Sequence, residues 1–210
     1  MSLLTTWGYT ITDADALPPM LTDAEFDAMT ANKYAGDARI SPAISAASAA
    51  IRDYCGWHVY PSQACEWKER LLYGNGRIKR TGPDILIQLP AAYVTGVTSV
   101  MIGDEPWTDY ALATNGIMRL FDVPRYRVDR KTEITVTYTA GLPGGLMAAI
   151  KELAAHGVTH ALVSPAGIQS ETAGGVSVTY AANWINSARA SALGDESKDA
   201  LTPYRLLEVF

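Results

Sequence analysis

The sequence predicts an α+β fold: a helical body with an inserted small antiparallel β subdomain and a flexible arm. Apolar residues recur at three- and four-residue spacings before residue 60 and after residue 141, and they alternate with polar residues in between. The chain has 210 residues, which is enough to bury a core without disulfides. We expect an N-terminal arm at 1–20, a helical body at 21–60 and 141–210 with an arm at 165–185, and a β-rich subdomain at 61–140.

Composition and charge argue against two classes of protein. The formal net charge of −5 is unlike that of proteins that grip nucleic acid through phosphates, which need clustered Lys and Arg. The short basic run Arg77–Arg80 is interpreted as a solvated hairpin, with a phosphate-contacting loop as the alternative. No run reaches the roughly 18 apolar residues of a membrane span. Cys55 and Cys65 are expected to be reduced thiols in a cytoplasm.

Two capping patterns in the N-terminal part of the chain each predict the start of a helix. Thr22 as N-cap with Glu25 three residues later predicts a capping box and a short first helix. Ser41 followed by Pro42 predicts a second start. The second helix should run about four turns and end near Gly56. Its apolar face is predicted to hold Ile40, Ile44, Ala47, Ile51 and Tyr54, and its Ala- and Ser-rich remainder would allow a neighbouring helix or subunit to approach closely.

The middle of the chain is predicted to form strands because its apolar and polar residues alternate with a period of two. Gly103-Asp104 separates two of the runs as a hairpin turn would. The expected strands lie near residues 65–71, 85–89, 94–102, 116–121 and 132–139.

The helical period returns after the sharp corner Gly141–Gly145, with a third helix at about 145–163 that should pack on the second. The Gly-hinged segment Ser170–Tyr180 then predicts a flexible strand or hairpin arm. Residues 186–200 are expected to be loosely ordered, and a last short helix is expected from Thr202 to Phe210.

One constellation on the third helix could carry chemistry. Glu152, His156 and His160 are spaced four residues apart, so they fall roughly on one face as metal ligands could. The spacing differs from the His-Glu-x-x-His pattern of zinc peptidases. A helix surface or a subunit interface is the favoured interpretation. Among the aromatic residues, Trp7 and Trp184 lie in segments that are hard to bury locally, which suggests intersubunit anchors.

Short motifs resemble a known family. The strand end Val136–Gly141 precedes an Ala-rich helix and a segment, Ser170–Tyr180, that finishes Val-Thr-Tyr. The helix Ile44–Tyr54 runs into Tyr-Cys-Gly. Over residues 40–56 and 134–210 the chain resembles tailed-bacteriophage head-tail connector proteins, also called adaptor or head-completion proteins.

The resemblance implies a structural virion protein without catalytic, cofactor-binding or metal sites. Its partners would be other copies of itself in a ring, a dodecamer in the virion, together with the portal and a stopper or tail protein. DNA would pass through the ring without specific binding, no membrane would be involved, and the protein would be in the host cytoplasm during assembly. The candidate interface residues are Ser170, Glu171, Gly174, Gly175, Val176, Val178, Tyr180, Trp184, Tyr204, Leu207 and Phe210.

Rival classes stay open at this point. A minor virion or tail-joining protein would share the arm and the apolar C-terminal end. A metal-dependent hydrolase would use Glu152, His156 and His160 and would take up metal tightly. A DNA binder of the small-terminase kind would show strong salt-dependent binding.

Overall fold

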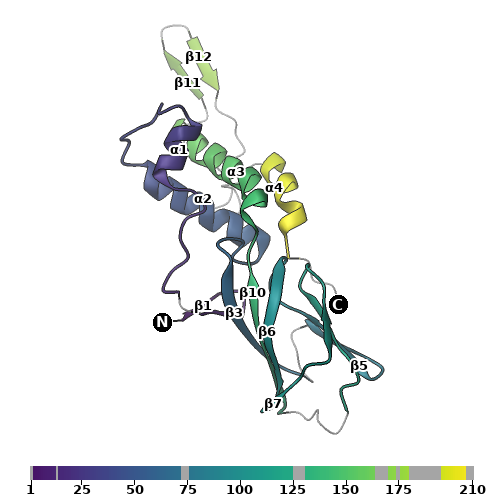
Figure 1. Cartoon of the computed structure of the whole chain (residues 1–210). Coiled ribbons are helices and arrows are strands. Elements are labelled where there is room, and N and C mark those ends of the chain that lie inside the picture. The colour runs from purple at the N-terminus through teal and green to yellow at the C-terminus, as the bar shows by residue number, and fades with distance from the viewer. Residues whose placement is uncertain are drawn as a thin grey trace. The chain divides into compact units, whose positions relative to one another are not determined.

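The computed structural model in Figure 1 divides into two compact units, and each is described by itself. The α+β prediction is confirmed: the α-helices lie in one unit together with the two-stranded sheet of β11 (Ser170–Ala173) and β12 (Val176–Thr179), and the two larger antiparallel sheets lie in the other unit. The β unit comprises Met1–Leu17, Gly56–Pro143 and Tyr204–Phe210, and the helical unit comprises Pro18–Cys55 and Gly144–Pro203. The structure describes residues 2–12, 14–71, 76–124, 131–163, 170–173, 176–179 and 195–206.

The helical unit is organised around its second helix, which packs against the other three. Its described elements are α1 (Asp23–Met29), α2 (Ile40–Cys55), α3 (Gly144–Val163) and α4 (Asp195–Leu201), followed by the 3₁₀ turn η3 (Thr202–Tyr204). The three helices expected before residue 164 are therefore confirmed, with starts within one or two residues of the predicted ones.

The predicted capping box at the start of α1 is present. The Thr22 hydroxyl accepts from the Glu25 amide at 3.2 Å, and the Glu25 carboxylate accepts from the Thr22 amide at 2.8 Å. The Lys151 ammonium on α3 bonds the same carboxylate at 2.5 Å. Together with the capping amide, this bond lowers the pKa of Glu25 below its usual range. One acidic side chain thus caps α1 and ties it to α3.

Two buried polar side chains of α2 hydrogen-bond to the backbone of the loop that precedes α1. The Ser48 hydroxyl accepts from the Met20 amide at 2.9 Å and donates to the Ile44 carbonyl at 2.8 Å. The Arg52 guanidinium donates to the Pro18 carbonyl at 2.5 Å. The apolar face of α2 is buried much as its spacing predicts, although Tyr54 is only half-buried. Ser48 and Arg52 satisfy backbone groups of a loop that has no regular secondary structure of its own.

The β unit contains two antiparallel sheets. The six-stranded sheet has the order β1-β2-β3-β10-β6-β7, and the four-stranded sheet has the order β4-β5-β9-β8. The strands are β1 (Leu3–Leu4), β2 (Thr10–Ile11), β3 (Gln63–Arg70), β4 (Ile78–Thr81), β5 (Asp84–Gln88), β6 (Val94–Ile102), β7 (Glu105–Pro106), β8 (Tyr110–Leu112), β9 (Ile117–Leu120) and β10 (Glu133–Ala140).

Strand β10 is central to the larger sheet, lying between β3 and β6. Val136 stands opposite Trp67 on β3 and Val100 on β6, and all three side chains are buried. Alternate residues of β10 are buried, as the period of two predicts for a sheet with one apolar face. In the smaller sheet the buried apolar residues are Ile85 and Ile87 of β5 and Met118 and Leu120 of β9.

The N-terminal segment is part of the larger sheet. Thr10 and Ile11 pair with Glu66 and Cys65 of β3, and both Tyr9 and Ile11 are buried. The Tyr9 hydroxyl lies 2.7 Å from Nδ1 of the buried His58 and accepts from the His58 amide at 3.0 Å. The pairing and the buried bonds attach this segment to the β unit by backbone and side chains alike.

Buried His58 links three parts of the β unit. Its Nε2 lies 2.9 Å from the Ala140 carbonyl, which can only accept, so Nε2 carries the proton. In the tautomer that is protonated at Nε2 alone, Nδ1 accepts from the Tyr9 hydroxyl. His58 therefore has a structural hydrogen-bonding role that joins the N-terminal segment to the end of β10.

The predicted sharp corner after β10 is present and depends on glycine. Gly141 has a φ of +142°, and a Cβ added there would lie 2.3 Å from the Ser62 Cα. Three residues later α3 begins. The backbone of Ser62 therefore leaves no room for a side chain at position 141.

Two expectations for the C-terminal part were wrong where the structure describes it. Of residues 186–200, which were expected to be loosely ordered, 195–200 belong to α4, which ends in the fully buried Leu201. Of the helix expected from Thr202 to Phe210, Thr202–Tyr204 form a 3₁₀ turn and Arg205 and Leu206 are not helical. Residues 186–194 and 207–210 lie outside the described residues. Burial of Leu201 anchors a short polar helix whose own sequence carries little apolar periodicity.

Candidate interaction surfaces

The segment predicted to be an arm forms a separate two-stranded sheet. Strand β11 (Ser170–Ala173) pairs antiparallel with β12 (Val176–Thr179), as Figure 1 shows. Ala173 stands opposite Val176, so a two-residue connection joins the strands. Four of the candidate interface residues are thus brought together: Ser170, Glu171, Val176 and Val178.

The hairpin register pairs residues of two chemical kinds. Ser170 stands opposite Thr179 and Thr172 opposite Ser177, so residues that bear hydroxyl groups pair with one another. Glu171 stands opposite Val178 and Ala173 opposite Val176. A two-stranded sheet is at best marginally stable in water, so this hairpin is suited to pairing with a further surface.

Several candidate interface residues lie outside the described part of the chain. They are Gly174, Gly175, Tyr180, Trp184, Leu207 and Phe210. Their assignment to an interface stays a prediction, as does that of the four hairpin residues.

Tyr204 contacts the chain's own β unit. Its carbonyl accepts from the indole nitrogen of the fully buried Trp57 at 2.8 Å. The Cβ of Leu206 lies 3.7 Å from the position that a Cβ on Gly56 would occupy. The chain from Tyr204 to Leu206 therefore docks beside the start of the second β-unit segment, and a partner contact of the Tyr204 side chain stays a prediction.

Trp7, proposed as an intersubunit anchor, is half-buried and stacks on Tyr9 with ring centroids 6.2 Å apart. Leu4, nearby in the same segment, is 76% exposed and is the most exposed large apolar residue of the described chain. The N-terminal segment is thus held to the larger sheet at Tyr9 and Ile11, and it exposes the apolar side chain of Leu4.

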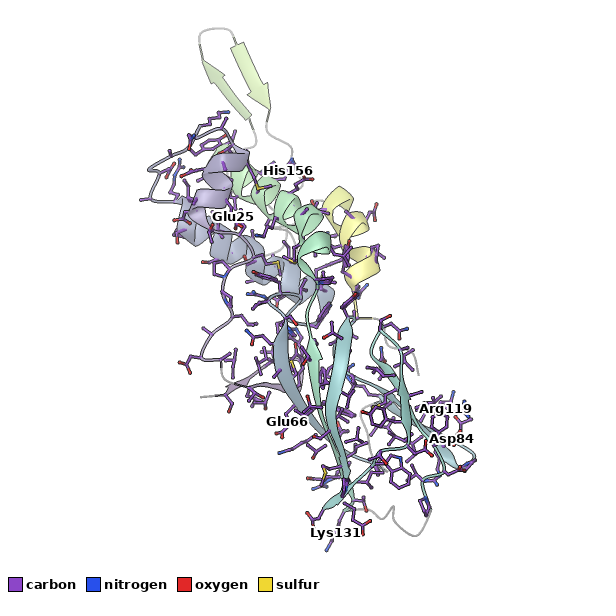
Figure 2. The ribbon with its side chains drawn as sticks, viewed as in Figure 1. Glu25, Glu66, Asp84, Arg119, Lys131 and His156 are labelled. Carbon is purple, nitrogen blue, oxygen red and sulfur yellow. The ribbon has the colours of Figure 1, made fainter. Side chains whose placement is uncertain are left out.

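The three candidate metal ligands lie along α3. Glu152 and His156 are exposed and His160 is half-buried. Figure 2 labels His156 on this helix. Burial, and then the neighbouring His156, lower the pKa of His160. Within the described ranges, no group of three His, Cys, Asp or Glu side chains is arranged to hold a metal ion. The described helices also include none with the length and apolarity of a membrane crossing.

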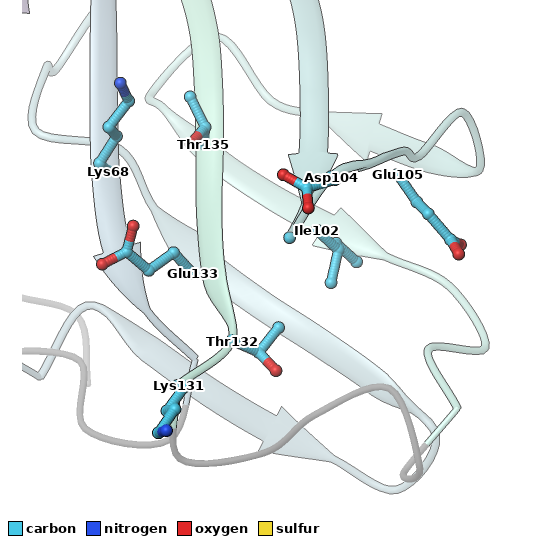
Figure 3. A pocket seen from close by; sticks show the side chains of 9 residues that line it. Lys68, Ile102, Asp104, Glu105, Lys131, Thr132, Glu133 and Thr135 are labelled. Carbon is cyan, nitrogen blue, oxygen red and sulfur yellow. The ribbon is translucent and has the colours of Figure 1, made fainter.

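An open hollow of about 700 Å³ lies at one end of the larger sheet, between β3, β10 and the β6–β7 turn (Figure 3). Cationic and anionic side chains share its lining. The charged residues are Lys68, Asp104, Glu105, Lys131 and Glu133. Because the lining mixes charges of both signs, the hollow offers polar contacts to a protein surface more readily than a site for one kind of ion.

The sequence patterns did not predict an ion pair that joins two strands of the smaller sheet. The buried Asp84 on β5 accepts from Nε of Arg119 on β9 at 2.8 Å and from the Asp122 amide at 3.1 Å (Figure 2). Hydrogen bonding to Arg119 lowers the pKa of Asp84. Arg119 also lies over the Phe121 ring, 5.0 Å from its centroid. No spacing rule joins residues 35 positions apart, so only strand pairing reveals this pair.

The described chain is thus an α+β protein that carries a separate two-stranded hairpin, β11–β12. The profile of a family described as head completion protein matches residues 20–187. The match covers both helices and sheets, and the chain belongs to that family of bacteriophage head-completion proteins. A search among curated proteins found no match.

Proposed function

We propose that this head-completion protein is a head-tail connector that assembles as a ring beneath the portal and joins the capsid to the tail. The observation that carries the proposal is the family match over residues 20–187. The ring would be a dodecamer in the virion, with the portal on one side and a stopper or tail protein on the other. The role is structural and needs no cofactor.

The hairpin β11–β12 is the arm by which one copy reaches the next copy or the portal. A ring is built from heterologous interfaces, in which one patch meets a different patch. A two-stranded sheet supplies one such patch by strand addition or by burial of its valine residues. Residues 207–210, which end the chain in Leu-Glu-Val-Phe, would supply a second docking element.

Passage of DNA through the ring agrees with the charge of the chain. A formal net charge of −5 disfavours retention of a polyanion. DNA would therefore move through the ring without specific binding.

The test is an in-vitro joining assay with portal-bearing capsids that lack this protein. A chain with residues 170–180 deleted should stay folded, as judged by circular dichroism, and should fail to restore joining. Normal joining by the deletion protein would overturn the role of the arm. A failure of the intact chain to bind such capsids would overturn the connector function itself.

A matched pair of variants separates the two sets of alternating positions on β12. Val176→Asp with Val178→Asp places two charges at the valine positions and should reduce capsid joining at least tenfold, since buried unpaired charges weaken an interface strongly. Ser177→Asp with Thr179→Asp adds the same charge at the hydroxyl-bearing positions and should leave joining near the wild-type level. Equal losses in both variants would contradict a contact through the valines.

A further inference from the structure

Helix α3 carries a second row of side chains on the side away from its buried face. Its buried residues include Met147, Ile150, Ala154, Val158 and Leu162. Another set recurs at spacings of three, four, three, four and three residues, which is the repeat of a coiled-coil seam. This set, called the α3 seam here, is Leu146, Ala149, Leu153, His156, His160 and Val163.

The α3 seam is exposed, yet it is more apolar than an exposed helix face normally is. Leu146 is 40% exposed and Val163 is 48% exposed. Ala149 and His156 are also exposed, and Leu153 is half-buried. A surface helix normally places charged residues opposite its core face. The seam contains no Asp, Glu, Lys or Arg, so packing it against another helix would not bury a permanently charged side chain without a partner.

Helix α2 presents a complementary row. Pro42, Ala46, Ala49 and Asp53 recur at spacings of four, three and four residues, and all four are exposed. This row, the α2 seam, is formed mainly by small residues, which let a second helix backbone approach closely. Its one charged residue is Asp53, and the α3 seam contains no acidic residue that would repel it.

We propose that the α3 seam of one copy packs against the α2 seam of the next copy. The inference rests on the proposed ring, in which two different patches of the same chain must meet at each interface. Large side chains at Leu146, Leu153 and Val163 would fill the shallow surface over Ala46 and Ala49. Matching three- and four-residue spacings are what helices need to pack side by side.

Pairing of two α3 seams with each other is the rival arrangement. It would make a two-fold dimer and would bring His156 and His160 of both copies into one contact. It would also leave the α2 seam uncovered and could not close a ring. The heterologous pairing avoids both problems.

Disulfide trapping of the full chain distinguishes these arrangements. Ala49→Cys and Ala149→Cys replace exposed residues in the two seams, while the native Cys55 and Cys65 are buried. Under oxidation, the double variant should give a ladder of covalent oligomers beyond the dimer, and either single variant should give none. Dimers from Ala149→Cys alone would establish α3–α3 pairing and overturn the proposal. Absence of a ladder from the double variant would overturn it as well.

A charge test adds a readout that does not depend on disulfides. Ala46→Glu should weaken self-association at least tenfold in light scattering, and adding Ala149→Lys should restore it, because the two charges meet across each interface. Ala148→Glu is the matched control, being exposed on α3 but outside the seam. If the added Lys fails to restore association, the two seams do not meet. Because these experiments use the purified chain alone, they can fail while capsid joining succeeds, and the reverse also holds.

Discussion

Gly141→Ala tests the strand-to-helix corner most directly. At a φ of +142° a residue with a side chain is strained, and the added Cβ would lie 2.3 Å from the Ser62 Cα, 2.7 Å from the Ser62 nitrogen and 2.8 Å from the Pro61 carbonyl oxygen. All three contacts are with backbone, which cannot rotate away as a flexible side chain could. Strained backbone of this kind costs about 1–3 kcal/mol. Overpacking costs about 1–3 kcal/mol more.

We therefore expect Gly141→Ala to lower the free energy of unfolding of the β unit by about 4 kcal/mol. This is a large fraction of the roughly 5–15 kcal/mol by which a typical domain is stable. The assay is urea denaturation followed by tryptophan fluorescence, which reports on the buried Trp57 and Trp67 of the β unit. The midpoint should fall with little change in the denaturant slope.

Gly145→Ala is the matched control, four residues further along the same corner. Nothing lies within 4 Å of a Cβ added at Gly145, and this glycine is in the first turn of α3. Because Ala is favoured over Gly in helices, this variant should be neutral or stabilised by up to about 1 kcal/mol. A loss of less than about 1 kcal/mol in Gly141→Ala would refute the argument that the Ser62 backbone excludes a side chain.

Three further predictions concern single interactions. Thr22→Ala removes half of the capping box of α1 and should cost about 1 kcal/mol in urea denaturation followed by circular dichroism; an unchanged midpoint would contradict the capping role. The lowered pKa of Asp84 means that its contribution to stability is present above the unfolded value of about 3.9 and is lost as pH falls through the lower folded value. Asp84→Asn should therefore flatten the decline in thermal midpoint between about pH 5 and pH 2, and an acid profile identical to wild type would exclude this contribution. Trp57→Phe removes the donor to the Tyr204 carbonyl and should cost about 1 kcal/mol and speed proteolysis after residue 203; equal cleavage rates would show that the bond does not hold the C-terminal segment.

Much of the secondary structure could be predicted because its signals are local. Thr22 with Glu25 marks the start of α1, and the spacing of apolar residues marks α2 and α3. The period of two located β6 at Val94–Ile102 and the hairpin turn after it. The Ser170–Tyr180 segment was predicted as a strand or hairpin arm, and the described strands β11 and β12 confirm the hairpin.

The candidate surfaces could be predicted only in part. The hairpin was found because Gly residues and alternating Val residues are adjacent in the chain. The charged hollow was not found, because it combines Lys68 of β3 with Asp104 of the β6–β7 turn and Glu133 of β10. Helix α4 was missed because its seven residues carry too little apolar periodicity to mark a helix, and the burial of Leu201 depends on the fold.

The sequence alone determined the fold class, the corner at Gly141 and the resemblance to head-completion proteins, because caps, periods and turn residues act over a few positions. Only the tertiary structure decided that β10 lies between β3 and β6, that the N-terminal segment joins their sheet, and that Asp84 pairs with Arg119. These outcomes depend on which distant segments bury their apolar faces together. Many pairings satisfy a strand's local pattern equally well, and only the packed core selects one of them.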